Sequence, residues 1–236
     1  MGRRVRFGLM AGLFLLIAGY AVWMGLPGEA VAAAYPVRGV DVSAYQGEID
    51  WAVLSDGLDF AFIKATEGSS YTDPMFRQNL EGALDARLRV GAYHFFSFDS
   101  RWDAQAAHFI STVPADERLL PPVVDVELYG AHRSHPPEPD AVRASLELLL
   151  GELEAHYGRR PILYATGRSY RLYLQGAFRE YPIWIRDVHL PPSLPDGRGW
   201  LFWQYSDRAR LPGYSGPESC IDRNVFCGSP EEFSRL

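Results

Sequence analysis

The chain has 236 residues, 47% of them apolar, and a formal net charge of −6. This length can bury one sizeable core, so a single barrel or sandwich domain accounts for it. Residues 1–34 hold three arginines and one glutamate, so residues 35–236 carry 20 basic and 28 acidic side chains, a formal charge of −8. Such an acidic body argues against a nucleic-acid ligand and predicts no basic patch for anionic lipid.

The N-terminal end predicts export. Residues 1–6 include three arginines, and residues 7–26 form an uncharged apolar run, long enough to cross a bilayer of about 30 Å. We expect residues 1–34 to be a signal peptide or a membrane-anchor helix outside the fold. Ala30-Val31-Ala32 and Ala32-Ala33-Ala34 both fit the cleavage pattern, so cleavage and retention both stay open. Residues 35–236 would then be periplasmic or extracellular, with membrane contact only through the N-terminal segment if it is uncleaved.

After residue 35, strand-like runs alternate with helical patterns, as is typical of parallel strands joined by helices. Strands are predicted at residues 37–43, 59–65, 89–96, 122–127 and 161–166, and helices at 49–56, 73–88, 102–113 and 138–157. Three more strands, at residues 183–186, 200–205 and 221–226, are separated only by loops. Eight strands with helices after the first five predict an α/β barrel related to the (β/α)8 type, with its final helices reduced or lost.

The two cysteines, Cys220 and Cys227, flank the last predicted strand. In an oxidising compartment they could close a disulfide, and the alternative is two free thiols. Two cysteines alone do not make a zinc site, and an isolated His-x-x-His at His132 and His135 lacks a third ligand. We expect no metal and no cofactor.

Two carboxylates, Asp125 and Glu127, follow the apolar run at residues 122–124. In a barrel of parallel strands, reactive groups gather where the strands end, and residues two apart on a strand share a face. Two close carboxylates make each other harder to ionise, so one can keep its proton and act as the general acid that glycosidic cleavage needs. Alone, this pair is weak evidence, because acidic pairs are common on solvated strands.

Two more carboxylates strengthen the case. Asp41 lies at the end of the first predicted strand and Asp222 is placed at the end of the last. First and last strands are neighbours once a barrel closes, so four carboxylates would converge on one opening. The alternative for Asp41 and Asp222 is turn formation or capping, which Asp often serves at such junctions.

Aromatic residues gather at the same strand ends. Flat rings suit the apolar faces of sugars, and the polar tips of Tyr and Trp still form hydrogen bonds. Each is individually more typical of core packing, but as a group they favour a carbohydrate groove. The candidates are Tyr45, Tyr93, Phe95, Tyr164, Trp184, Trp203 and Tyr205.

These motifs resemble the glycoside hydrolase family 25 lysozymes, the Chalaropsis-type muramidases. The resemblance spans residues 38–228 and rests on spaced motifs that include Gly39-Val40-Asp41-Val42-Ser43, Phe62-Ile63-Lys64-Ala65-Thr66-Glu67-Gly68, Gly91-Ala92-Tyr93-His94-Phe95, Asp125-Val126-Glu127, Trp203-Gln204-Tyr205-Ser206 and Asp222-Arg223-Asn224. One departure is Arg186, which follows Trp184-Ile185 where the family usually has Ala. The change puts the sugar contacts on this rim in doubt.

The resemblance implies a flattened barrel of five β/α units followed by three strands in residues 35–236. It implies hydrolysis of the β-1,4 bond between N-acetylmuramic acid and N-acetylglucosamine in peptidoglycan, without a metal. A monomer is the default expectation. Glu127 would be the proton donor and Asp125 its partner, with Asp41 and Asp222 completing the acidic centre. The substrate's N-acetyl group could act as the nucleophile.

Two alternatives compete with this reading. One is a catalytically silent glycan-binding module, which would have no need for a costly carboxylate cluster. The other is a chitinase-like hydrolase, although Pro121 and Pro122 stand where chitinases of that kind carry alternating acidic residues.

Overall fold

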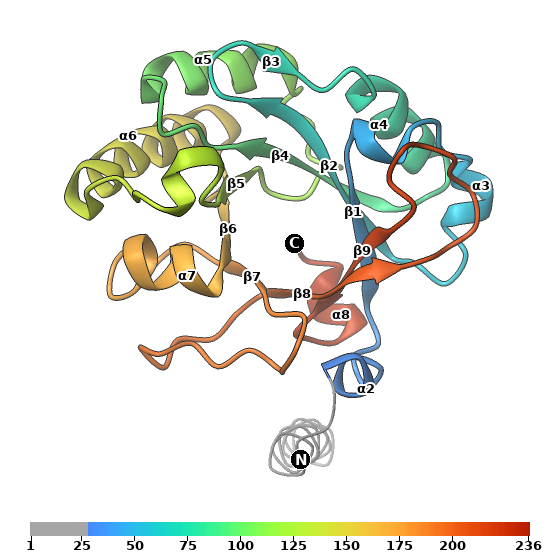
Figure 1. The fold of residues 1–236 in the computed structure, drawn as a ribbon. Helices are drawn as coiled ribbons and strands as arrows, with labels where there is room; N and C mark the ends of the chain where they lie inside the picture. Colours follow the sequence, from blue (N-terminus) through green and yellow to red (C-terminus); the bar gives the residue numbers. More distant parts are fainter. Residues whose placement is uncertain (1–27) are drawn as a thin grey trace, which may run out of the picture.

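The computed structural model describes residues 28–236, and the predicted apolar segment 7–26 lies outside them. Eight strands close into a barrel (Figure 1). In hydrogen-bonded order around the ring they are β1 (Arg38–Val42), β9 (Ile221–Phe226), β8 (Phe202–Ala209), β7 (Ile183–Arg186), β6 (Ile162–Thr166), β5 (Val123–Val126), β4 (Arg89–Phe95) and β2 (Phe60–Glu67), which pairs again with β1. A short strand, β3 (Tyr71–Thr72), extends β2 beyond the ring.

Strand direction confirms the predicted fold class. Seven barrel strands run parallel to one another, whereas β9 is antiparallel to both of its neighbours, β1 and β8. Helical segments follow each of the first five barrel strands, and β7, β8 and β9 follow without intervening helices. The α/β barrel therefore has five β/α units and three further strands.

The helices of these units cover the outside of the ring (Figure 1). They are α3 (Trp51–Leu54), α4 (Phe76–Asp85), α5 (Trp102–Thr112), α6 (Pro139–Tyr157) and the short α7 (Gly167–Ser169) continued by the π-helix η3 (Tyr170–Leu174), with 3-10 turns η1 (Ala44–Gln46) and η2 (Gly130–Arg133). The first two are shorter than the sequence predicts. In α6, Pro139 starts the helix and Gly158, at φ 66°, ends it, because proline fits the first turn and glycine the left-handed cap.

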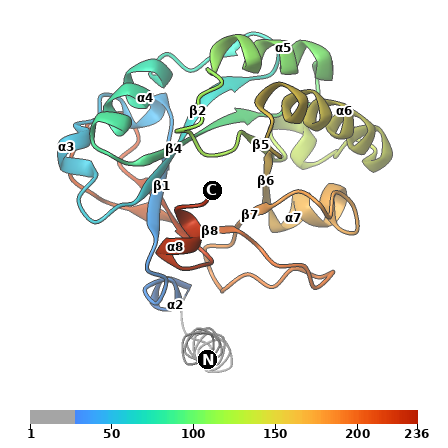
Figure 2. The same cartoon turned by 180° about the vertical axis from the view of Figure 1, so that it is seen from behind.

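Aromatic side chains fill the interior of the barrel. Phe62 stacks on Trp184 with ring centres 4.4 Å apart, and Phe60 and Phe202 pack beside them. The end opposite the strand C-termini is closed by α8 (Pro230–Phe233), whose Phe233 contacts Phe60 and Phe202. Figure 2 shows α8 within the outline of the ring. The barrel interior is thus filled at that end, and its open mouth lies at the other.

A further helix, α2 (Gly28–Ala32), covers the outside of β8 and β9, where the barrel lacks following helices (Figure 1). Its Val31 and Ala32 are buried against Trp203, Tyr205 and Val225. Residues 28–34 belong to the predicted leader 1–34, so the end of that leader contacts the barrel through Gly28, Val31 and Ala32. No helix within residues 28–236 is long and apolar enough to span a membrane.

The predicted disulfide is not formed, because Cys220 and Cys227 are both free thiols. They lie at opposite ends of β9, which is six residues long. An extended strand of that length separates its ends by roughly 20 Å, whereas a disulfide needs Cα atoms within about 7 Å. The length of β9 therefore excludes a disulfide between Cys220 and Cys227.

Candidate active site

A cleft of about 300 Å³ opens at the C-terminal ends of the parallel strands. All four predicted carboxylates line it, together with Val42, Ser43, Tyr45, Gln46, Lys64, Tyr93, Phe95, Tyr164, Trp184, Gln204, Asp207, Glu218 and Cys220. The predicted convergence of Asp41, Asp125, Glu127 and Asp222 is present in the structure. Among residues 28–236 no group of three or more His, Cys, Asp or Glu side chains could hold a metal ion.

Asp41 and Asp222 face each other across the β1–β9 ladder. The sequence prediction put Asp222 at the end of the last strand, but it lies at the beginning of β9. Because β9 runs antiparallel to the other strands, its N-terminal end is the one that reaches the cleft. Burial raises the pKa of both carboxyls. The rise is larger for Asp222, because the nearby charge of Asp41 also raises its pKa.

Two amide side chains hold this pair. Gln204 Nε2 donates to Oδ2 of Asp41 at 2.9 Å and to Oδ2 of Asp222 at 2.8 Å. Asn224 Nδ2 donates to the same Asp41 oxygen at 2.7 Å. The amides are oriented in turn, since Tyr164 donates its hydroxyl to Gln204 and Trp184 donates its indole N–H to Asn224, both at 2.8 Å. Each amide thus has its carbonyl engaged behind it and its NH₂ group aimed at the carboxylates.

Asp125 and Glu127 form the second pair. Asp125 is the penultimate residue of β5 and is buried, while Glu127 follows the strand and is half-buried. Burial raises the pKa of Asp125 well above its ordinary value, and the charge of Glu127 raises it further. Burial also raises the pKa of Glu127, against the lowering effect of Arg186. The pair therefore retains a proton more readily than solvated carboxyls do.

One oxygen of this pair has no partner. Asp125 Oδ1 is buried and accepts no hydrogen bond from any residue in the described range 28–236. A buried carboxylate oxygen without a donor is costly, so such an atom in a cleft marks a place where a ligand donor is expected.

Two cations flank the carboxylates. Lys64 Nζ pairs with Glu67 at 2.6 Å and lies 5.0 Å from the centre of the Phe95 ring. Its partner Glu67 lies on the same strand, β2. Arg186, at the end of β7, pairs with Asp207, whose side chain lines the cleft. The positive charge of Arg186 lowers the pKa of Glu127 and of Asp41.

Five of the seven predicted aromatic residues line the cleft: Tyr45, Tyr93, Phe95, Tyr164 and Trp184. They differ in exposure, because Tyr45 is 68% exposed whereas Tyr164 and Trp184 form the buried floor. Tyr45 lies in η1, which Asp73 fixes by accepting the backbone N–H of Ala44 at 2.8 Å. Tyr45 is therefore a ring on a fixed turn at the edge of the cleft.

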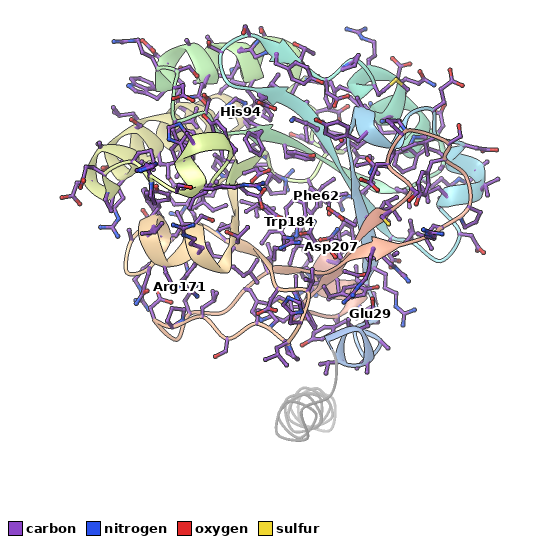
Figure 3. The ribbon with its side chains drawn as sticks, in the orientation of Figure 1. Glu29, Phe62, His94, Arg171, Trp184 and Asp207 are labelled. Atoms are coloured by element: carbon purple, nitrogen blue, oxygen red, sulfur yellow. The ribbon has the colours of Figure 1, made fainter. Side chains whose placement is uncertain are left out.

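Trp203 and Tyr205 do not line the cleft, which corrects their assignment as substrate-binding residues. Side chains alternate along β8, so Phe202 and Gln204 point into the barrel while Trp203 and Tyr205 point outward onto α2. The Trp203 indole donates to the carbonyl of Asp187 at 2.8 Å. Figure 3 shows the two sides, with Trp184 beside Phe62 inside the ring and Glu29 on α2.

The site also contains residues that were not singled out as functional. Gln204 and Asn224 belong to the sequence motifs given above, but the substrate-binding role was assigned to the aromatic residues on either side of Gln204. The available signal was the two-residue period, because Asn224 must share a face with Asp222 on one strand. Asp207, Glu218 and Cys220 left no such signal, since Asp207 lies where the register of β8 is irregular and the other two lie in the loop before β9.

Comparison with known proteins decides the family. Residues 40–214 match the model of Glycosyl hydrolases family 25. The chain belongs to this family. A family 25 glycosyl hydrolase from Bacillus anthracis has a similar structure, with a TM-score of 0.81 and 49% sequence identity over 86% of this chain and 94% of that one.

Two curated relatives extend the comparison. The protein YegX of Escherichia coli (strain K12), called uncharacterized, is 38% identical over 86% of this chain and 74% of its own length. The N,O-diacetylmuramidase of Chalaropsis is 31% identical over 80% of this chain and 95% of its own length. This family 25 member is accordingly a glycoside hydrolase, as the sequence motifs predicted.

Proposed function

We propose that this family 25 hydrolase is a muramidase, which cleaves the β-1,4 bond between N-acetylmuramic acid and N-acetylglucosamine in peptidoglycan. Family membership and the likeness to an N,O-diacetylmuramidase support the proposal. The observation that carries it is the cleft itself, in which Asp125 and Glu127 lie side by side with raised pKa values. Peptidoglycan strands are the substrate, and the alternatives of a silent binding module or a chitinase are not favoured.

Glu127 is the proton donor in this proposal. It is the more exposed member of the pair, so its proton can reach the departing glycosidic oxygen of a sugar chain in the cleft. Burial raises the pKa of Glu127, and the charge of Asp41 raises it further, while Arg186 lowers it. A general acid of this kind works best when its pKa lies near the working pH.

Asp125 positions the substrate's acetamido group. Its unpartnered Oδ1 can accept the N–H of the N-acetyl group on the sugar whose anomeric bond breaks. That contact turns the acetamido carbonyl oxygen toward the anomeric carbon, where it forms a bond as the leaving oxygen takes the proton of Glu127. Water then opens the cyclic intermediate and returns a proton to Glu127, so no covalent bond to the protein forms.

Asp41 supplies negative charge in the cleft, whereas Asp222 stays protonated beside it. Gln204 and Asn224 hold Asp41 in its ionised form by donating to it, so this carboxylate can stabilise the positive charge that develops on the sugar ring. Asp222, whose pKa is raised further, keeps a proton and shares the Gln204 donor.

The enzyme acts on the wall side of the membrane and stays attached through its N-terminal segment. Cleavage at Ala30–Ala32 or Ala32–Ala34 would remove or detach α2 and expose Trp203, which is 0% exposed with α2 in place. Hydrophobic burial of this kind favours a mature chain that retains α2, with residues 7–26 as the anchor.

The activity test uses purified peptidoglycan and chitin oligomers. After digestion, borohydride reduction and mass spectrometry identify which sugar carries the new reducing end. New muramic acid ends support the muramidase. New N-acetylglucosamine ends from peptidoglycan, or turnover of chitin alone, would contradict it, and binding without any new ends would indicate a silent module.

The attachment test measures the intact mass of the mature chain in membrane and soluble fractions. A membrane-bound chain that retains residues 1–27 is expected. A soluble chain that starts at residue 33 or 35 would show that α2 is dispensable and that attachment is wrong.

A further inference from the structure

A second hollow lies on the outer face of the barrel, beside α2. It has a volume of about 510 Å³ and is lined by Glu29, Ala33, Arg38, Tyr205, Arg208, Ala209 and Arg223. Its three arginines come from three neighbouring strands, β1, β8 and β9. Residues 28–236 carry 20 basic and 29 acidic side chains, so a hollow with three cations and one carboxylate stands out.

This cluster corrects the expectation that the body has no basic patch. Arg38, Arg208 and Arg223 are far apart in the sequence, and net charge says nothing about their placement. Pairing of β9 with both β1 and β8 brings them together, because Val40 lies opposite Arg223 on one side and Ser206 lies opposite it on the other. Only barrel closure assembles the patch.

The three guanidinium groups have no acidic partner. None of them forms an ion pair with any residue from 28 to 236. Arg38 is held by the carbonyl oxygens of Ala33 and Tyr35, at 3.0 Å and 3.3 Å. Arg223 lies with its guanidinium carbon 5.8 Å from the centre of the Tyr205 ring, and its Nε is buried without a hydrogen-bond partner in the described chain.

Such an arrangement suits an oxyanion with several acceptor atoms. One guanidinium group can donate two parallel hydrogen bonds to the oxygens of a phosphate. Guanidinium groups also tolerate partial burial better than ammonium groups do. The one carboxylate, Glu29, is already engaged, since its Oε1 accepts the hydroxyl of Ser206 at 2.9 Å. The unpaired Arg223 Nε is a donor that a bound phosphate group would satisfy.

We infer that this hollow binds the phosphate group of an anionic phospholipid headgroup. The choice of a lipid rests on the proposed attachment through residues 7–26. Gly28, the first residue of α2, follows that apolar run by two residues, which span at most about 7 Å. Glu29 and Ala33 line the hollow, so it lies close to the point where the chain would leave the membrane. Arginines at that distance attract anionic lipid.

The test uses the full-length chain in micelles of a neutral detergent, doped with phosphatidylglycerol or phosphatidylcholine, and counts retained lipids by native mass spectrometry. The wild-type chain is expected to retain phosphatidylglycerol in preference to phosphatidylcholine. Arg208→Gln combined with Arg223→Gln should reduce that retention roughly 30-fold. Arg210→Gln is the matched control, because Arg210 is exposed and two residues from Arg208 but does not line the hollow.

Equal retention of the two lipids, or retention unchanged in the double variant, would overturn the inference. Glycerol phosphate is the second probe. If it binds as tightly as phosphatidylglycerol does, the site takes a soluble phosphate and the lipid assignment is wrong. The intact mass from cells reports separately on attachment, so a cleaved mature chain would refute attachment even where the full-length chain selects anionic lipid.

Discussion

Asp41 on β1 and Asp222 on β9 are direct cross-strand partners, and a single amide, Gln204 Nε2, donates to both carboxylates. Two buried carboxyls on directly paired residues cannot both ionise without a large electrostatic cost. The hydrogen bond from Gln204 lowers the pKa of Asp41 and so favours a negative charge on that carboxyl. The relationship depends on the reversed direction of β9, which brings Asp222 to the same edge as Asp41.

Replacing Gln204 with Met should weaken catalysis and move the acid limb of the pH profile to higher pH. Burial raises the pKa of Asp41 and Gln204 opposes that rise, so without the amide Asp41 ionises only at higher pH. The change also removes the Tyr164–Gln204 hydrogen bond, at a stability cost of about 1 kcal/mol. The pH dependence of kcat/KM on peptidoglycan is the measurement. Gln105→Met, at a buried glutamine that bonds His94, should destabilise the fold without moving the limb.

Replacing Arg186 with Ala should move the alkaline limb to higher pH. Burial raises the pKa of Glu127, and Arg186 is the largest opposing influence, ahead of Tyr164 and Arg133. Without this cation Glu127 holds its proton at higher pH and still acts as an acid there. Arg186→Lys keeps the charge and should leave the limb near that of the parent. A limb that shifts equally in both variants would point to packing rather than charge.

The Asp222→Asn variant should be more stable than the parent at neutral and alkaline pH. Burial and the charge of Asp41 raise the pKa of Asp222 to about 9, from 3.8. Between these values the folded chain binds more protons than the unfolded chain, so stability falls as pH rises through this window. Asparagine has no proton to lose, so thermal unfolding should show a gain at pH 8 that disappears near pH 4. A constant gain at all pH values would exclude this linkage.

Trp203→Ala separates the structural role of this residue from the substrate-binding role that its motif suggested. Its side chain is fully buried under α2, so truncation should cost about 3–5 kcal/mol in the free energy of unfolding while KM stays unchanged. Tyr45→Ala is the counterpart, because Tyr45 is exposed at the cleft edge. It should raise KM with little change in unfolding. The reverse pattern would restore the original assignment.

The sequence predicted the barrel and the four carboxylates because strand ends and two-residue spacing are local signals. Asp125 and Glu127 share a face on any strand. The direction of β9 was not predictable, since parallel and antiparallel strands have similar local patterns, and so Asp222 was assigned to the wrong end of its strand. The outward orientation of Trp203 was missed because an aromatic residue within a family motif resembles a sugar contact. The arginine cluster beside α2 depends on pairings between distant strands, which one sequence does not encode locally.

The most direct test of the central claim compares the parent with Glu127→Gln on two substrates, peptidoglycan and an aryl glycoside whose leaving group needs no protonation. Loss of a general acid should lower kcat on peptidoglycan by about 10²–10⁴-fold and leave turnover of the aryl glycoside nearly unchanged. Equal activity of the two chains on peptidoglycan would contradict the assignment of Glu127 as the acid. An equal loss on both substrates would show that protonation of the leaving oxygen is not the step that depends on Glu127.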